Sequence, residues 1–186
     1  MLRPALFLDR DGVINIDHAY VHRREHFDFV DGIFELVRTA RERGYLVFVV
    51  TNQAGIARGK YTEQDFHTLT EWMSGEFTAR DAPIDKVYFC PYHAEHGVGV
   101  YKQESPFRKP NPGMILQAAQ EFDVDLAASV LLGDMETDIQ AGSRAGVGRT
   151  LLFRPPGHAR PDVTLAHAIV GSHAEVHAFL PQSVKA

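Results

Sequence analysis

Four short polar segments of the chain contain side chains that together suit phosphoryl transfer. They contribute two aspartates two positions apart, a threonine, a lysine and a later aspartate: Asp9, Asp11, Thr51, Lys109 and Asp134. An aspartate can attack phosphorus and form an aspartyl-phosphate. A second carboxyl group can protonate the leaving alkoxide and later deprotonate water, while hydroxyl and ammonium groups donate to phosphate oxygens. This set predicts a reaction in which positioning and charge neutralisation supply most of the catalysis.

The carboxylates of this set also predict a metal site. If Asp9, Asp11 and Asp134 converge, their like charges repel and raise one another's pKa. A hard divalent cation with oxygen ligands removes that repulsion, and Mg²⁺ typically takes one or two carboxylates together with substrate phosphate. We therefore expect Mg²⁺ as the cofactor.

Alternating strands and helices are expected to position these segments. Short apolar runs predict buried strands at 5–8, 45–50, 86–90, 129–132, 149–153 and 168–170. Apolar residues at helical spacing predict helices at 32–43, 62–79, from Asn111 onward, 136–145 and 173–180. Such alternation implies parallel βαβ units with right-handed crossovers. The expected fold class is α/β, a Rossmann-like parallel sheet with helices on both faces.

The polar segments fall where ligands bind in such a sheet, beyond the carboxyl ends of the strands. Asp9 and Asp11 follow the first predicted strand, Thr51 the second, and Asp134 the fourth, with Asp138 four residues further on. A lone Asp-x-Asp or Gly-Asp is more often a turn or a solvated loop. It is the order of all four segments, each at the end of a strand or the start of a helix, that predicts a site.

Length and composition narrow the function classes. The 186 residues suit one domain, which we expect over 1–186 with a loop insertion at 91–108. The net charge of −5 argues against a nucleic-acid-binding protein. The single cysteine excludes an intrachain disulfide and fits a reducing compartment. No apolar stretch approaches the ~20 residues of a membrane span, and the N-terminal apolar run is too short for a signal peptide. These features predict a cytoplasmic protein without a membrane partner, and by default a monomer.

The motifs resemble those of haloacid dehalogenase-like (HAD) phosphatases. The four segments read Phe7-Leu8-Asp9-Arg10-Asp11-Gly12, Val50-Thr51-Asn52-Gln53, Arg108-Lys109-Pro110 and Gly133-Asp134. Within that superfamily, residues 15–22, 51–60 and 69–73 resemble the branch that acts on heptose bisphosphates. The resemblance extends from Leu6 to Phe153 and is weak beyond.

The resemblance implies a role for each matching residue. Asp9 is expected to be the nucleophile and Asp11 the general acid and base, with Thr51 and Lys109 holding the transferring phosphoryl group. Asp9, Asp134 and the backbone carbonyl of Asp11 are expected to hold Mg²⁺. Arg108, whose planar guanidinium can bind a phosphate bidentately, is expected to contact the distal phosphate. The residues expected to line the sugar pocket are Asp17, His18, Ala19, Tyr20, Asn52, Gln53 and Ala54.

The implied activity is hydrolysis of the C7 phosphate of a heptose 1,7-bisphosphate, a step toward nucleotide-activated heptose for lipopolysaccharide and other cell-surface glycans. Phosphatases of histidinol phosphate or of another small sugar phosphate share these motifs and remain alternatives. A phospho-receiver module is a remote alternative, because its phospho-accepting aspartate lies on a later strand than its acidic cluster. An inactive relative that only binds is disfavoured, because all the chemical groups are present.

Two departures from the family pattern bear on cofactors and substrate. In many members of the family, the loop that corresponds to the one before Arg108 binds structural Zn²⁺ through Cys-x-His and Cys-x-Cys. The corresponding residues here are Cys90-Pro91-Tyr92 and Ser105-Pro106-Phe107. Structural zinc prefers four N or S ligands, so we expect no structural zinc and a loop ordered by apolar packing. It stays open whether Cys90 binds any metal with His93 or His96. The second departure is Met135, where many members carry a lysine that contacts substrate.

Two further expectations concern access to the site and the C-terminal histidines. The residues between Asp11 and Thr51 are accounted for by a loop, one helix and one strand, so no large cap domain fits there. The site is therefore expected to be open to solvent. His167, His173 and His177 lie in the weakly matching region and are predicted to be at the surface.

Overall fold

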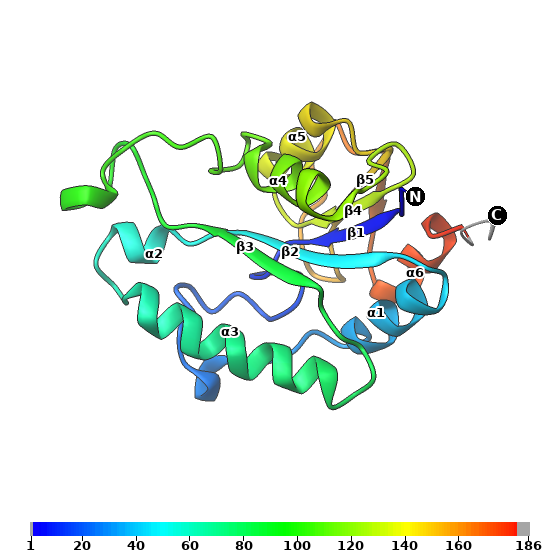
Figure 1. Ribbon diagram of the computed structural model, residues 1–186, viewed down its shortest axis with the longest axis horizontal. Helices are drawn as coiled ribbons and strands as arrows, with labels where there is room; N and C mark the ends of the chain where they lie inside the picture. The colour runs from blue at the N-terminus through cyan, green and yellow to red at the C-terminus, as the bar shows by residue number, and fades with distance from the viewer. Residues whose placement is uncertain (1, 182–186) are drawn as a thin grey trace.

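A six-stranded parallel sheet forms the centre of the computed structural model, which describes residues 2–181 (Figure 1). The strands lie in the order β3-β2-β1-β4-β5-β6, and every neighbouring pair is parallel. Their bounds are β1 (Ala5–Leu8), β2 (Leu46–Asn52), β3 (Lys86–Cys90), β4 (Val130–Gly133), β5 (Arg149–Phe153) and β6 (Ala168–Val170). The predicted α/β class with a parallel sheet is confirmed, and the described residues include no large cap domain.

Helices cover both faces of the sheet, as the sequence predicts. Their bounds are α1 (Ile33–Glu42), α2 (Ala54–Ala57), α3 (Glu63–Thr78), α4 (Gly113–Phe122), α5 (Glu136–Ala145) and α6 (His173–Val176). Helices α1, α3 and α6 lie on one side of the sheet, and α4 and α5 lie on the other (Figure 1). Single 3₁₀ turns at 24–26, 99–101 and 177–179 complete the regular structure of the described chain.

Alternation along the strands divides the core between the two faces. In β1, Leu6 and Leu8 pack in the cluster that includes Ile33 of α1. Phe7, between them, packs in the opposite cluster with Ile115 of α4. All four residues of β1 are fully buried, and each large apolar side chain buried in this way stabilises the fold by about 1.5–3 kcal/mol. This two-sided burial fixes the central strand and, with it, the residues that follow it.

Helix α3 begins with a reciprocal pair of hydrogen bonds between Thr62 and Asp65. The backbone N–H of Asp65 donates to Thr62 Oγ1 (3.1 Å), and the Asp65 carboxylate accepts from the backbone N–H of Thr62 (2.8 Å). These reciprocal bonds satisfy two of the orphan donors at a helix start. Four apolar residues at helical spacing are the buried residues of the helix: Phe66, Leu69, Met73 and Phe77.

The predicted start of α4, with Asn111 as the cap and Pro112 as the first helical residue, is one residue too early. Asn111 does not cap the helix, because its side-chain amide donates to the carbonyl of Ser105 (2.9 Å) and ties the preceding loop together. The helix begins at Gly113 instead, after Pro112. Strand β2 also runs two residues further than predicted, to Asn52, so Thr51 lies in the strand rather than after it.

The C-terminal histidines differ from the surface prediction in one clear case. His173 is 1% exposed, stacks on Phe153 with 4.8 Å between ring centroids, and has Nδ1 2.8 Å from the carbonyl oxygen of Asp31. Burial lowers its pKa, so the ring stays neutral. The surface prediction is therefore wrong for His173. It is confirmed for His167, which is exposed, while His177 is partly buried.

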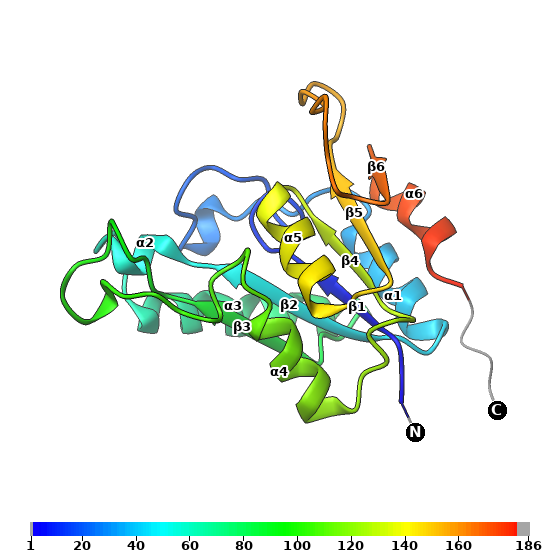
Figure 2. The ribbon, with the colours of Figure 1, turned by 90° about the horizontal axis from the view of Figure 1, so that it is seen from above.

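The segment between β3 and α4 extends beyond the sheet beside α2 (Figures 1 and 2). The backbone N–H of Val98 donates to the carbonyl of Ala57 (2.9 Å), and the Tyr101 hydroxyl donates to Glu63 (2.8 Å). At the base of the segment, Tyr92 and Phe107 pack against one of the core clusters. These contacts connect the long loop to α2, to α3 and to the core.

Within residues 2–181, none of the helices combines the length and the apolar character that a bilayer crossing requires.

Candidate active site

The sheet reverses its strand order between β1 and β4, and ligands in open α/β sheets bind at such a switch point. The polar segments predicted from the sequence meet there. They line a cavity of about 240 Å³, together with neighbours: Asp9, Asp11, Asp17, Thr51, Asn52, Lys109, Asp134, Met135, Thr137 and Asp138. The strand order also counts against the receiver alternative, since receivers have the flavodoxin-like order 2-1-3-4-5.

Lys109 lies at the floor of this cavity between two carboxylates. Its Nζ is 2.8 Å from Asp9 Oδ1 and 2.5 Å from Asp138 Oδ1, and it also donates to the carbonyl of Val50 (2.8 Å). Burial alone would lower the pKa of the ammonium group, but Asp138 and Asp9 outweigh burial and hold that pKa above its usual range. The side chain is therefore a permanent buried cation beside Asp9.

Asp138 is a site residue to which sequence reasoning gave no role. Its second oxygen accepts from the backbone N–H of Met135 (2.9 Å), just before α5, so the carboxylate closes the first turn of the helix and pairs with Lys109. It is 2% exposed. An aspartate three positions after the N-cap of a helix usually accepts a hydrogen bond from the first turn. The position of Asp138 in the sequence therefore indicated a capping residue and not a counter-ion of Lys109.

Asp9, Asp134 and Asp138 form a crowded group of carboxylates, with one oxygen of each within 4.8 Å of the others. Burial, then Asp138, raises the pKa of Asp134 to about 6. Burial also raises the pKa of Asp9 well above its ordinary value, with Asp138 and Asp134 adding to it and Lys109 opposing it. Lys109 donates to one oxygen of Asp9 and to one oxygen of Asp138. The other oxygen of Asp9 and the carboxylate of Asp134 are oxygen ligands that fit a hard cation.

Gly12 makes the approach of Asp134 possible. Its φ is +87°, and a Cβ at this position would lie 2.3 Å from Asp134 Oδ2. Any other residue would therefore displace the carboxylate and strain the backbone. The glycine that follows Asp11 in the sequence is thus a requirement of the acidic cluster.

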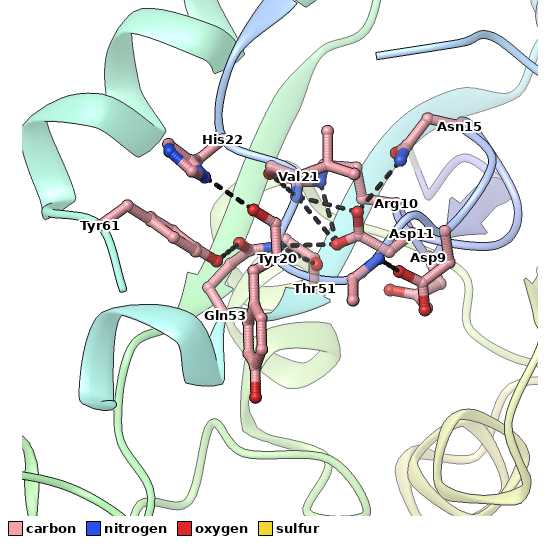
Figure 3. Close-up of polar contacts among 12 residues, drawn as sticks. Asp9, Arg10, Asp11, Asn15, Tyr20, Val21, His22, Thr51, Gln53 and Tyr61 are labelled. Carbon is pink, nitrogen blue, oxygen red and sulfur yellow. Dashed lines mark hydrogen bonds and ion pairs between the residues drawn. The ribbon is translucent and has the colours of Figure 1, made fainter. Parts of the chain in front are cut away.

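The Asp11 carboxylate is held by its neighbours in the chain (Figure 3). Arg10 donates to both of its oxygens, from Nε at 3.1 Å and from Nη2 at 2.9 Å, and Asn15 Nδ2 adds a third bond (3.1 Å). Arg10 is itself 1% exposed, donates to the carbonyl of Val21 (2.7 Å) and lies about 6 Å from the ring centroids of Phe27 and Phe66. A bidentate ion pair between the buried Arg10 and the partly buried Asp11 fixes the orientation of Asp11.

Asn52 connects β2 to the segment that carries Lys109. Its side chain accepts from the Lys109 backbone N–H and donates to the Lys109 carbonyl, both at 3.0 Å. The amide therefore clamps the backbone from which the buried lysine projects.

A second cavity, of about 310 Å³, adjoins the first. It shares Asp11, Asp17 and Asn52 with it, and the other predicted sugar-pocket residues that line it are Ala19, Tyr20, Gln53 and Ala54. The two cavities together give room for a ligand larger than phosphate.

Ala19 and Tyr20 have φ of 60° and 55°, a left-handed conformation that is uncommon for residues other than glycine.

Two predicted substrate residues lie apart from both cavities. His18 Nε2 is 2.8 Å from Asp28 Oδ2 at the surface. Arg108 is half-buried, and its Nη1 donates to the carbonyl of Tyr92 (3.2 Å). Burial lowers the pKa of the Arg108 guanidinium, and nearby Arg58 lowers it further. Met135 is in the wall of the first cavity and is 55% exposed.

Comparisons with known proteins agree on one class of enzyme. A family model described as HAD-hydrolase-like matches residues 106–170. The chain is 59% identical over 180 residues to the D-glycero-alpha-D-manno-heptose-1,7-bisphosphate 7-phosphatase of Burkholderia mallei, covering 97% of this chain and 95% of that protein. It is 44% identical over 183 residues to the D-glycero-beta-D-manno-heptose-1,7-bisphosphate 7-phosphatase of Escherichia coli K12, covering 98% and 94%.

A solved structure with the same architecture carries ligands. The D,D-heptose 1,7-bisphosphate phosphatase from B. bronchiseptica, complexed with magnesium and phosphate, superposes with a TM-score of 0.82 at 26% identity, over 95% of this chain and 97% of that one. The similarity therefore spans nearly the whole of both chains.

Proposed function

The chain belongs to the heptose-1,7-bisphosphate 7-phosphatases of the HAD-like hydrolases, and we propose that it hydrolyses the C7 phosphate ester of D-glycero-D-manno-heptose 1,7-bisphosphate. The observation that carries the proposal is the buried Lys109, paired with Asp9 and Asp138 and lying beside Asp134. The cation and the proposed nucleophile line one small cavity, and an adjoining cavity that shares three of its lining residues supports binding of a sugar.

The reaction has two steps, each with a balanced proton transfer. In the first, a carboxylate oxygen of Asp9 attacks phosphorus, the bond from phosphorus to the C7 oxygen breaks, and Asp11 gives its proton to the leaving alkoxide. In the second, water attacks the phosphorus of the aspartyl-phosphate while Asp11 takes a proton from that water. The bond from phosphorus to the Asp9 oxygen breaks, which restores the Asp9 carboxylate and releases phosphate. Thr51 donates to an oxygen of the transferring phosphoryl group. The three N–H groups of Lys109 are directed to Asp9, Asp138 and the Val50 carbonyl, so Lys109 stabilises the phosphoryl group through its positive charge.

The proposed cofactor is Mg²⁺, which HAD phosphatases use. The proposed ligands are Asp9, Asp134 and the backbone carbonyl of Asp11, and their oxygen chemistry fits this ion. Bound there, Mg²⁺ neutralises charge on the carboxylates and the phosphoryl oxygens. The neighbouring structure from B. bronchiseptica, complexed with magnesium and phosphate, supports this choice.

Mg²⁺ is expected to raise the melting temperature by more at pH 7.5 than at pH 5. The pKa of Asp134, raised from 3.8 to about 6, means that the folded protein holds protons that the unfolded chain releases. The metal-free protein therefore loses stability as pH rises from 4 through 6. Mg²⁺ removes the repulsion that appears over that interval, and at a hundred times its Kd it adds about 2.7 kcal/mol, several degrees for a chain of this size.

Melting curves with MgCl₂ and with EDTA, at the two pH values, measure this effect. Asp134→Asn is the matched control, because it keeps the size of the side chain and removes one charge. A gain that is equal at both pH values would contradict the prediction.

The substrate of the proposed reaction spans both cavities. We place the heptose against Asp17, Tyr20 and Ala54 in the second cavity. We assign the distal phosphate to Arg108, which lies outside both cavities and near the cationic side chain of Arg58. The higher identity to the enzyme named for the alpha anomer, 59% against 44% for the beta enzyme, favours the alpha anomer at C1.

Phosphate release from the two anomers and from histidinol phosphate, with and without Mg²⁺, tests this proposal. We expect a Mg²⁺-dependent reaction with the highest kcat/KM for the alpha anomer. Preference for the beta anomer would overturn the anomer assignment alone, whereas preference for histidinol phosphate would overturn the substrate class.

The protein purified without a histidine tag is expected to contain no stoichiometric zinc. Three of the four family ligand positions carry other residues, and His93 Nδ1 lies 3.3 and 3.2 Å from the backbone N–H groups of Glu95 and His96, from which it accepts hydrogen bonds. Elemental analysis by mass spectrometry checks this expectation. One zinc per chain would show that Cys90 and the nearby histidines form a site after all.

A further inference from the structure

Gln53 and Tyr61 both line the second cavity, and both ends of the Gln53 amide are occupied. Gln53 is 1% exposed. Its Nε2 donates to Thr51 Oγ1 (2.9 Å) and to Asp11 Oδ2 (3.1 Å), while its Oε1 accepts from the hydroxyl of Tyr61 (Figure 3). An amide whose two donors and one acceptor are all paired within the protein has little capacity left for a ligand.

The direction of these bonds follows from Asp11. Its Oδ2 already accepts from Arg10, so it acts as an acceptor, and only the NH₂ end of Gln53 can face it favourably. The carbonyl end then faces Tyr61, which must be the donor. Because Thr51 Oγ1 accepts from Gln53, its own hydrogen is free to point into the cavity that Thr51 lines.

Tyr61 is held in place by close packing on its ring. A Cβ on Gly55 would lie 2.1 Å from Tyr61 Cε1, so the ring rests directly on the glycine backbone. His22 stacks on the ring, with centroids 5.0 Å apart and planes 7° from parallel. Burial raises the pKa of the Tyr61 hydroxyl well above its usual range, so it stays protonated and remains a donor.

We propose that Tyr61 and Gln53 form a positioning pair, which orients Asp11 and turns the Thr51 hydroxyl toward the transferring phosphoryl group. The pair acts through Asp11 and Thr51 rather than by touching the substrate. This inference rests on the proposed function, because it assigns the orientation of two groups of that reaction. It also gives Gln53 a different role from the sugar contact that the family resemblance implies.

Tyr61→Phe is the first test, with kcat and KM measured separately on two substrates. One is the heptose bisphosphate and the other is p-nitrophenyl phosphate, which lacks the sugar and the second phosphate. Loss of a group that orients an active-site residue typically costs 10-fold to 100-fold in activity. We expect kcat to fall about tenfold on both substrates while each KM stays within about twofold.

Tyr88→Phe is the matched control. Tyr88 is 5% exposed, and its hydroxyl donates to Glu121 Oε2 (2.8 Å), away from both cavities. The control therefore removes the same atom from a similarly buried tyrosine. We expect it to keep the wild-type kcat and to melt within a few degrees of Tyr61→Phe.

Gln53→Met is the second variant, for the case in which Tyr61→Phe folds poorly. It keeps the length of the side chain and removes all three hydrogen bonds, and we expect kcat to fall about 100-fold at unchanged KM. A rise in KM for the heptose bisphosphate alone, at unchanged kcat, would overturn the proposal and make the pair a substrate contact. Wild-type kcat in both variants would overturn it as well.

The second substrate separates this inference from the proposed function. If the wild-type protein hydrolyses p-nitrophenyl phosphate but not the heptose bisphosphate, the proposed substrate is wrong. The ratio of variant to wild-type kcat on p-nitrophenyl phosphate still decides whether Tyr61 and Gln53 position the reacting groups.

Discussion

Replacing Asp9 by asparagine is expected to lower phosphate release by about 1,000-fold or more while the protein stays folded. The amide cannot attack phosphorus, so the covalent step is lost. The fold persists because the asparagine carbonyl can still accept the hydrogen bond that Lys109 Nζ gives to Asp9 Oδ1. Burial, Asp138 and Asp134 raise the pKa of Asp9, so removing the charge of Asp9 also relieves repulsion. We therefore expect the metal-free variant to melt no lower than wild type.

Steady-state phosphate release and thermal melting measure the two parts of this prediction. Asp162→Asn makes the same chemical change at an exposed position and is expected to keep wild-type activity. Retained turnover in Asp9→Asn would refute the nucleophile assignment.

Replacing Lys109 by methionine is expected to abolish activity and to lower the free energy of unfolding by about 3–5 kcal/mol. The variant leaves Asp9 and Asp138 buried without the cation that now lies 2.8 and 2.5 Å from them. A buried charge that loses its partner is far more destabilising than the pair is stabilising. Urea denaturation of the metal-free protein measures the change.

Two companion variants separate stability from catalysis. Lys109→Met combined with Asp138→Asn removes one of the unpaired charges, so it is expected to recover part of the stability and none of the activity. Lys86→Met breaks an ion pair of similar length, 2.5 Å to Glu121, but on the surface, where such a pair contributes at most about 1 kcal/mol. If Lys109→Met were as stable as Lys86→Met, the buried cation would not be balancing the carboxylates.

The parts of the fold and site that the sequence could predict depend on local pattern. The apolar run of β1 and the bounds of α5 are each encoded within a few residues, and the structure has them as predicted. Convergence at one edge of the sheet followed from the parallel topology, and Asp9, Thr51 and Asp134 do line one cavity.

The parts that could not be predicted depend on contacts between distant residues. His173 is buried because it meets Asp31 and Phe153 across the fold. The pairing of Asp138 with Lys109 brings α5 to the segment before α4. The pattern of residues within either segment does not indicate such a contact, because the two segments become neighbours only when the sheet has formed.

The buried guanidinium of Arg10 connects the proposed general acid to two aromatic rings of the interior. It holds Asp11 on one side and lies near the rings of Phe27 and Phe66 on the other, so a change in either ring reaches the proposed general acid through a single intervening side chain. Neither ring belongs to either cavity. We therefore expect loosened packing around these two rings to disturb the orientation of Asp11 and to slow turnover.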